Sequence, residues 1–308
     1  MSLDLPREAA GPALAPGRDA SATLAGIGLT VLGVFLFSGC NALAKWLVAS
    51  YPVGETLFVR SLTALLLVAP FITRADLATL RPDRQFRWRP GLHLLRVFCS
   101  AIEVGCFYWA LVYIPLADVS TIYLAGPIYV TAMSALFLGE QVGWRRWTAV
   151  LAGFAGVLVA LRPTGNALSP QAVVAVLGSL LYAISLVATR RLRGTPNPVL
   201  VASQFAALLL LSAASAAFGW VLPTPGDAVL LALVGAVAML AYLCVNRGLQ
   251  LTPASVVAPF QYSSIIWAVA LGYVVFGDIP GINIVIGAAI IVGAGLVILF
   301  REEKRRRT

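Results

Sequence analysis

The chain has 308 residues, of which 60% are hydrophobic and only 11% are charged, and its formal net charge is +9. Soluble globular domains carry charged residues at about a quarter of their positions, so this composition excludes an ordinary soluble domain and indicates a membrane protein with many spans. A positive net charge is also typical of proteins that bind nucleic acid, and the distribution of charge along the chain must separate the two classes. The four cysteines form no CxxC spacing, which predicts neither a disulfide framework nor a metal site.

The first segment, residues 1–24, is predicted to be a disordered cytoplasmic tail. It holds three prolines and two glycines among scattered charges. It lacks the basic start, apolar run and cleavage site of a signal peptide, and it has too few apolar residues to form a core.

Ten apolar segments follow, each close to the roughly 20 residues that a helix needs to cross the hydrocarbon core of a bilayer. The fold class is therefore predicted to be all-α and polytopic, with ten transmembrane helices and a basic cytoplasmic tail at residues 301–308. The predicted spans are 25–44, 54–73, 92–113, 115–138, 144–161, 171–190, 198–219, 227–246, 253–276 and 281–300.

Basic residues alternate between the predicted loops. One side of the membrane receives 18 of them, including five in the loop 74–91, and the other side receives only Lys45 and Arg162. By the positive-inside rule, both termini and the loop 74–91 are predicted to be cytoplasmic. Because the charge has this topological explanation, we expect no nucleic-acid partner.

Two stretches, residues 110–141 and 248–279, share the same placement of proline, glycine and acidic residues at a constant offset of 138 residues. Each is predicted to form one membrane-spanning helix, with proline at its first turn and a glycine followed by a carboxylate at its far end. A shorter match joins residues 31–33 to residues 176–178 at an offset of 145. The pairs that fall in register at the first offset include Pro115 and Pro253, Gly139 and Gly277, and Glu140 and Asp278.

Five predicted spans separate the two copies, so the second copy enters the membrane from the opposite side. The chain is thus divided into a first repeat at 25–161 and a second repeat at 171–300. Inverted repeats of this kind are typical of secondary transporters, whose binding sites lie near the bilayer midplane at the repeat interface.

Several motifs in both halves resemble the EamA domain, and the whole of 25–300 resembles the ten-helix drug/metabolite transporter superfamily. The resemblance is nearest to the branch of riboflavin and S-adenosylmethionine uptake carriers. It implies alternating access without an ATP site, and the sequence contains no Walker-type GxxxxGK[ST] motif. The motifs are 58–62, 108–111 with 115–117, 126–127, 138–140, 146–147, 153–157 and 161–163 in the first half, and 248–249, 253–255 and 276–278 in the second.

Glu103 is the sharpest functional candidate in the sequence. It lies near the centre of span 92–113, about 16 Å from either end at 1.5 Å per residue, where a carboxyl group cannot reach water and must face a cavity or a partner. The alternative is a structural ion pair with Arg60 or Arg96. Burial raises the pKa of a carboxyl group and a nearby arginine lowers it, so Glu103 is also the candidate for coupling to protons. Helical spacing places Arg96, Cys99, Ser100, Glu103, Phe107 and Ala110 on one face.

The two intramembrane arginines receive different predictions. Arg60 lies about 9 Å into its span and is expected either to bind an anionic group of a substrate or to pair with Glu103. Arg96 lies near the cytoplasmic end of its span and is expected to extend toward the lipid headgroups.

Aromatic and amide side chains supply the remaining candidates for a substrate cavity. Tyr123 and Gln261 are paired by the repeat offset, and each lies eight residues after its own proline, so both approach the midplane from opposite faces. Such groups suit stacking and edge hydrogen bonds with a planar ligand, although aromatics in membrane helices also serve as packing and interface residues. The other cavity candidates are Trp109, Gln204 and Tyr262.

Prolines and small residues inside the spans predict how the helices bend and pack. Pro127 and Pro259 interrupt backbone hydrogen bonding and are expected to bend their helices, as hinges or as static kinks. The small-residue series through Gly153 and Gly156, and through Gly287 and Ala288, predict faces where helices approach closely.

We expect a secondary transporter of a small organic metabolite in a bacterial inner membrane, with riboflavin uptake as the favoured activity. The predicted partners are a small-molecule substrate and the lipid bilayer, with a homodimer as a further option, and no cofactor is expected. Other carriers of the superfamily, for S-adenosylmethionine, amino acids or organic anions, and exporters remain alternatives. A membrane enzyme is disfavoured because no HExxH, GxSxG or acidic pair occurs, and a passive channel because channels are commonly symmetric rings around a pore.

Overall fold

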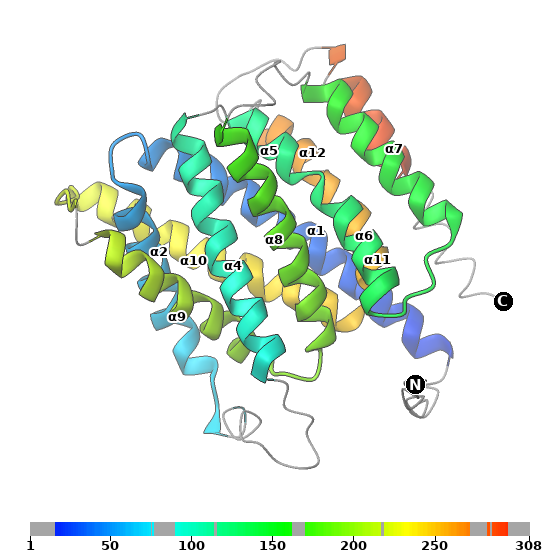
Figure 1. Cartoon of the computed structure of the whole chain (residues 1–308), viewed down its shortest axis with the longest axis horizontal. Coiled ribbons are helices and arrows are strands. Elements are labelled where there is room, and N and C mark those ends of the chain that lie inside the picture. Colours follow the sequence, from blue (N-terminus) through cyan, green and yellow to red (C-terminus); the bar gives the residue numbers. More distant parts are fainter. Residues whose placement is uncertain are drawn as a thin grey trace, which may run out of the picture.

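The computed structural model describes residues 16–74, 76, 90–113, 116–161, 170–216, 219–271, 282–283 and 285–294. All secondary structure in this part of the chain is helical, and the helices form one bundle (Figure 1). The all-α prediction is therefore confirmed for the described residues.

Within the described residues, six helices are long and apolar enough to cross a membrane, and the short 3-10 turn Ala69–Phe71 extends the second of them. Each overlaps a predicted span, and a proline lies at or next to the start of each helix, where it wastes no hydrogen bond. The first helix, α1, nevertheless begins at Pro16, so residues 16–24 are helical although they were predicted to belong to a disordered tail. At the start of α10, the Thr224 side chain also accepts a hydrogen bond from the backbone of Asp227. The six are α1 (Pro16–Leu47), α2 (Val53–Val68), α4 (Pro90–Tyr113), α8 (Pro170–Arg191), α9 (Asn197–Ala216) and α10 (Pro225–Leu251).

The prediction that 115–138 is one continuous helix is wrong. The segment forms α5 (Leu116–Tyr123) and α6 (Gly126–Phe137), separated by a turn at Leu124 and Ala125. Pro127, in the first turn of α6, has no backbone N–H to bond the carbonyl of Tyr123, so the helical ladder stops there. Pro127 thus breaks the helix into two pieces instead of merely bending it.

The segment 253–276 was also predicted as one helix, and its described part is again divided. It consists of α11 (Ala254–Val257), the 3-10 segment η2 (Ala258–Ser263) and α12 (Ser264–Leu271). Pro259 lies in the first turn of η2, as the kink prediction requires. Leu124 and Ala125, which separate α5 from α6, correspond at the offset of 138 to Tyr262 and Ser263, the last two residues of η2.

The helix α7 (Trp144–Leu161) packs at one side of the bundle against residues 285–294, drawn orange-red in Figure 1. A Cβ atom on Gly156 would lie 2.9 Å from the backbone oxygen of Gly287, and one on Gly153 would lie 2.4 Å from the ring of Tyr262. The predicted close approach at these small residues is therefore confirmed.

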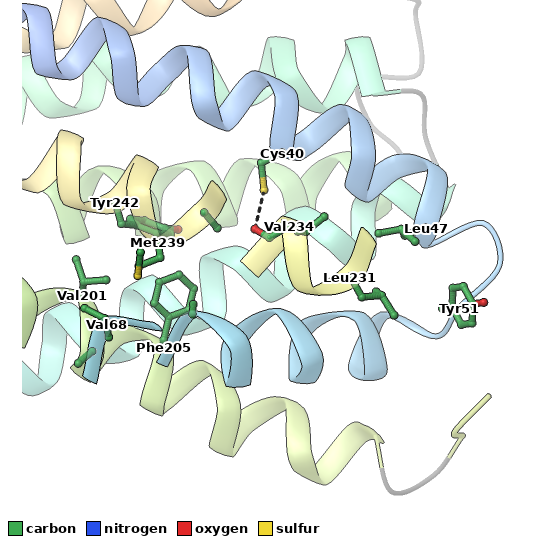
Figure 2. Close-up of a cluster of buried hydrophobic side chains, with 13 residues drawn as sticks. Cys40, Leu47, Tyr51, Val68, Val201, Phe205, Leu231, Val234, Met239 and Tyr242 are labelled. Atoms are coloured by element: carbon green, nitrogen blue, oxygen red, sulfur yellow. Dashed lines mark hydrogen bonds between the residues drawn. The ribbon is translucent and has the colours of Figure 1, made fainter. Parts of the chain in front are cut away.

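Helices from the two halves of the chain alternate in the centre of the bundle. The closest-packed pairs are α1 with α10, α4 with α8, and α2 with α9. Figure 2 shows the core of the first and third pairs, where Val68, Phe205, Met239 and Tyr242 meet. The Cys40 thiol on α1 donates to the backbone oxygen of Val234 on α10, 3.7 Å away. The core thus lies between the halves, so residues from both of them surround its polar side chains.

Candidate functional site

A cluster of polar side chains is buried among α1, α2, α4 and α10. Arg60 on α2 is 3% exposed and Glu103 on α4 is 5% exposed. The Arg60 guanidinium carbon lies 5.2 Å from the ring centroid of Tyr108, in a cation–π arrangement. Its charge also acts on Cys40, Tyr242 and Glu103. We call these five residues, Cys40, Arg60, Glu103, Tyr108 and Tyr242, the central polar cluster.

Hydrogen bonding within the central polar cluster is incomplete. The Tyr242 hydroxyl donates to Glu103 Oε1 at 3.4 Å, which is long for such a bond. Arg60 Nε and Nη1 and the Tyr108 hydroxyl have no hydrogen-bond partner in the described part of the chain. Among those residues, Glu103 also forms no ion pair within 4.0 Å with Arg60 or Arg96. The cluster therefore contains a buried cation with unpartnered N–H groups and a buried carboxyl group that accepts one long hydrogen bond.

Aromatic side chains line Glu103 on its other flank. The Tyr123 hydroxyl on α5 donates to the backbone oxygen of Glu103 at 2.9 Å. The Tyr123 ring packs edge-on against Phe107, with ring centroids 4.9 Å apart, and Tyr242 packs in the same way against Phe37 at 4.7 Å. Of the aromatic cavity candidates, Tyr123 is therefore the one that directly contacts Glu103.

The prediction for Arg96 is wrong. The side chain is fully buried and its guanidinium bonds helix α9: Nη2 donates to the backbone oxygen of Leu200 at 2.7 Å and to Ser203 Oγ at 2.8 Å. Nη1 donates to Gln204 Oε1 at 3.4 Å. These acceptors replace lipid phosphate as partners, so Arg96 ties α4 to α9 and Gln204 is already engaged by it.

The remaining candidates are scattered. Trp109 is 38% exposed on the outer face of α4 and packs against Tyr113, so it lies away from the central polar cluster. Tyr262 is buried against Gly153 and belongs to a hydrophobic cluster with Leu124 and Ile291. The side chain of Gln261, which is 6% exposed, makes no hydrogen bond in the described part of the chain.

A second set of polar contacts joins α6 to α11. Glu140 Oε1 accepts from the backbone N–H of Ala254 at 3.0 Å. Glu140 Oε2 accepts from the backbone N–H of Ser255 at 3.0 Å and from its hydroxyl at 2.6 Å. Arg190 Nε on α8 lies 3.8 Å from the carboxylate. We call Glu140, Arg190, Ala254 and Ser255 the Glu140 clamp, because it links the segment that follows α6 in the first repeat to the start of the broken helix in the second.

Sequence reasoning missed several of these residues. Cys40 and Tyr242 were not site candidates, although the offset of 138 places Tyr242 one residue from the equivalent of Glu103. Glu140 was interpreted only as the end of a span. The signal for its role was the serine at Ser255, which follows the helix-starting Pro253 in the opposite copy.

The cluster offers a guanidinium donor, a carboxyl group and phenol rings. No group of three histidine, cysteine or acidic side chains placed to hold a metal ion occurs among the described residues. The nucleophile, base and oxyanion-stabilising groups of a hydrolytic site are not assembled within it.

Curated relatives match this chain over most of its length. A riboflavin transporter of Rhizobium johnstonii is 30% identical over 281 residues, which cover 90% of this chain and 91% of that protein. A pseudopaline exporter of Pseudomonas aeruginosa is 30% identical and covers 91% and 97% of the two chains. An S-adenosylmethionine uptake transporter of Rickettsia bellii is 23% identical, with coverage of 91% and 94%.

A solved structure described only as "Crystal structure of protein" has the same fold. It superimposes with a TM-score of 0.74 at 22% identity and covers 92% of this chain and 98% of the other. The EamA-like transporter family matches residues 24–162 and 170–300. The apolar helices and the bacterial relatives identify the chain as a multi-pass bacterial membrane protein. Because these relatives are transporters, the chain is a small-molecule transporter and not an enzyme. It belongs to the EamA-like transporter family of the drug/metabolite transporter superfamily.

Proposed function

We propose that the chain is a secondary transporter that takes up riboflavin across the inner membrane by alternating access, with its binding site at the central polar cluster. The observation that carries this proposal is the buried Arg60, whose Nε and Nη1 have no partner in the described part of the chain although Glu103 lies nearby. A buried charged donor without an acceptor is costly. A substrate that supplies the acceptor removes that cost.

A flavin is the favoured substrate for two reasons. The cluster contains the phenol rings of Tyr108 and Tyr242, and Tyr123 bonds the backbone of its member Glu103. Rings of this kind can stack on a flat aromatic molecule. Two riboflavin transporters, from Rhizobium johnstonii and Vibrio cholerae, are among the relatives, at 30% and 28% identity. Uptake of S-adenosylmethionine and export of a metabolite are the rival activities within the family.

The proposed architecture is ten spans in two inverted repeats, 25–161 and 171–300. Contacts that are equivalent under the repeat offsets support it. Lys45 Nζ donates to the backbone oxygen of Leu111, and Arg190 Nη1 donates to that of Leu249 at 2.8 Å. The two donors, Lys45 and Arg190, are 145 residues apart in the sequence, and the two acceptors, Leu111 and Leu249, are 138 residues apart.

A packing contact supports the same architecture. A Cβ atom on Gly33 would lie 3.2 Å from the Cβ of Cys244, and one on Gly178 would lie 2.9 Å from that of Cys106. The two glycines are again 145 residues apart, and the two cysteines are 138 residues apart. The α1–α10 and α8–α4 interfaces are therefore candidates for repeat-related surfaces.

Alternating access requires a contact that closes one side of the membrane and breaks when that side opens. The Glu140 clamp is proposed to be this contact on the cytoplasmic side, to which the positive-inside rule also assigns both termini. It joins the two repeats through backbone and side-chain hydrogen bonds, so separation of α6 from α11 must break it.

Glu103 is proposed to couple the cycle to protons. Burial disfavours the charged form of a carboxyl group and a nearby arginine favours it. The Arg60 charge acts on Glu103 without forming an ion pair within 4.0 Å among the described residues. A movement of α2 against α4 would change this balance, and with it the affinity of Glu103 for a proton.

Growth of a riboflavin-auxotrophic strain that lacks its own uptake system tests the proposed substrate. Expression of this chain should restore growth on low external riboflavin. An Arg60→Gln variant of matched membrane abundance should not. Absence of growth with the wild-type chain at verified expression contradicts flavin uptake.

A further inference from the structure

The donors and acceptors in the central polar cluster form a specific pattern. Arg60 presents unpartnered N–H groups from α2, and Glu103 presents a carboxyl group from α4 whose one side-chain hydrogen bond in the described part of the chain is the long bond from Tyr242. The two charges interact, but no ion pair within 4.0 Å joins them in the described residues. An unpartnered donor and a sparsely bonded acceptor therefore lie within one buried cluster.

The hydrogen-bonding pattern restricts what a ligand of this cluster can be. Arg60 needs an acceptor for its N–H groups, and Glu103 can accept a further hydrogen bond. A ligand in which a hydrogen-bond acceptor adjoins a donor can bond both side chains and so removes the cost of leaving them buried without partners.

An imide edge, in which a carbonyl oxygen lies beside a ring N–H, has this arrangement. The pyrimidinedione end of a flavin carries such an edge, with the N3–H group between two carbonyl oxygens. Tyr108 supports the guanidinium from one side, with its ring centroid 5.2 Å from the guanidinium carbon, so the donors are fixed beside an aromatic face. A flat heterocycle bonded to that guanidinium can pack against the neighbouring phenol rings.

On the basis of the proposed flavin transport, we infer that Arg60 and Glu103 determine specificity by reading this edge. Arg60 donates to a carbonyl oxygen of the pyrimidinedione, and Glu103 accepts the hydrogen of N3. The ribityl chain and the benzenoid ring take no part in this recognition. The site therefore discriminates by hydrogen bonds at one edge of the ring and not by ligand charge.

Flavin fluorescence quenching by the purified full-length chain in detergent tests the inference. Riboflavin is compared with 3-methylriboflavin, in which a methyl group replaces the N3 hydrogen, and with 8-demethylriboflavin, which is altered only at the benzenoid ring. Loss of one hydrogen bond to a charged group corresponds to about tenfold or more in affinity. The 3-methyl analogue should bind at least about tenfold more weakly than riboflavin, and the 8-demethyl analogue should bind within about threefold of it.

The Glu103→Leu variant should bind riboflavin and 3-methylriboflavin equally, and the Arg60→Met variant should bind both more weakly. Trp109→Phe, on the outer face of α4, is the matched control and should retain the wild-type discrimination. Because the ligand comparison is made in the wild-type chain, it remains decisive if a variant does not fold.

Equal binding of riboflavin and 3-methylriboflavin by the wild-type chain overturns the inference and leaves flavin transport standing. Absence of any flavin binding overturns the proposed substrate and the inference together. Binding of S-adenosylmethionine instead, weakened by both substitutions, would assign Arg60 and Glu103 to the carboxylate and ammonium of an amino-acid group and would equally overturn the imide assignment.

Discussion

Removal of the Glu140 carboxylate should open the cytoplasmic side of the protein. Glu140 accepts three hydrogen bonds from Ala254 and Ser255, two of them from backbone N–H groups at the start of α11. Loss of a capping side chain costs about 0.5–2 kcal/mol, and hydrogen bonds to charged groups contribute about 1.5–3 kcal/mol each. In the open state water replaces these contacts, so Glu140→Ala should shift the equilibrium by about 2 kcal/mol, or about 30-fold, toward that state.

The shift can be measured with a single cysteine at Val257, a buried position of α11, in a background without the four native cysteines. Its reaction with a small maleimide occurs in the open state, so the rate should increase by up to about 30-fold when Glu140 is replaced by alanine. Asp227→Ala is the matched control, because Asp227 makes comparable bonds to Tyr51 and Thr224 at the start of α10 but takes no part in the Glu140 clamp. An unchanged rate in Glu140→Ala, or an equal acceleration in both variants, would refute the clamp as a gate.

Three further predictions concern coupling, packing and topology. Glu103→Gln should retain binding and counter-flow in proteoliposomes but lose accumulation driven by a pH gradient, and undiminished accumulation would remove Glu103 from the coupling mechanism. Gly156→Leu should lower the melting temperature in detergent, because even a Cβ atom there would lie 2.9 Å from the backbone oxygen of Gly287. Overpacking of this kind costs about 1–3 kcal/mol. Gly105→Leu is the control and should change the melting temperature much less, because a Cβ atom at Gly105 has no neighbour within 4 Å. A cysteine introduced at Asp83 should be protected from an impermeant maleimide in intact cells, and labelling from the periplasm would reverse the proposed orientation of the loop 74–91.

The long helices were predictable from the sequence because their information is local. An apolar run of sufficient length, begun by a proline and followed by polar residues, has few alternatives in a membrane. The predicted span 92–113 and helix α4 (Pro90–Tyr113) differ by only two residues at one end. The break between α5 and α6 was not predictable with the same rules, since a proline inside a membrane helix is compatible with a bend as well as with a complete interruption.

The side-chain predictions failed where they depended on a neighbouring helix. Arg96 was expected to extend toward the headgroups from its depth alone, but the backbone oxygen of Leu200 and the side chain of Ser203 on α9 provide closer acceptors. Trp109 lies directly after Tyr108 in the sequence, and the 100° step between consecutive helical residues is enough to place one in the cluster and the other outside it. Glu103 was found because a carboxyl group at mid-span is informative without knowledge of its neighbours.

Counter-flow in proteoliposomes tests the central claim most directly. Vesicles that contain the purified chain are loaded with unlabelled riboflavin and diluted into a trace of labelled riboflavin. An alternating-access carrier should transiently concentrate the label inside without any ion gradient, and Arg60→Gln should abolish this accumulation at equal reconstitution. Simple equilibration of the label without overshoot, or an overshoot that is unaffected by the Arg60 substitution, would contradict a carrier with its binding site at the central polar cluster.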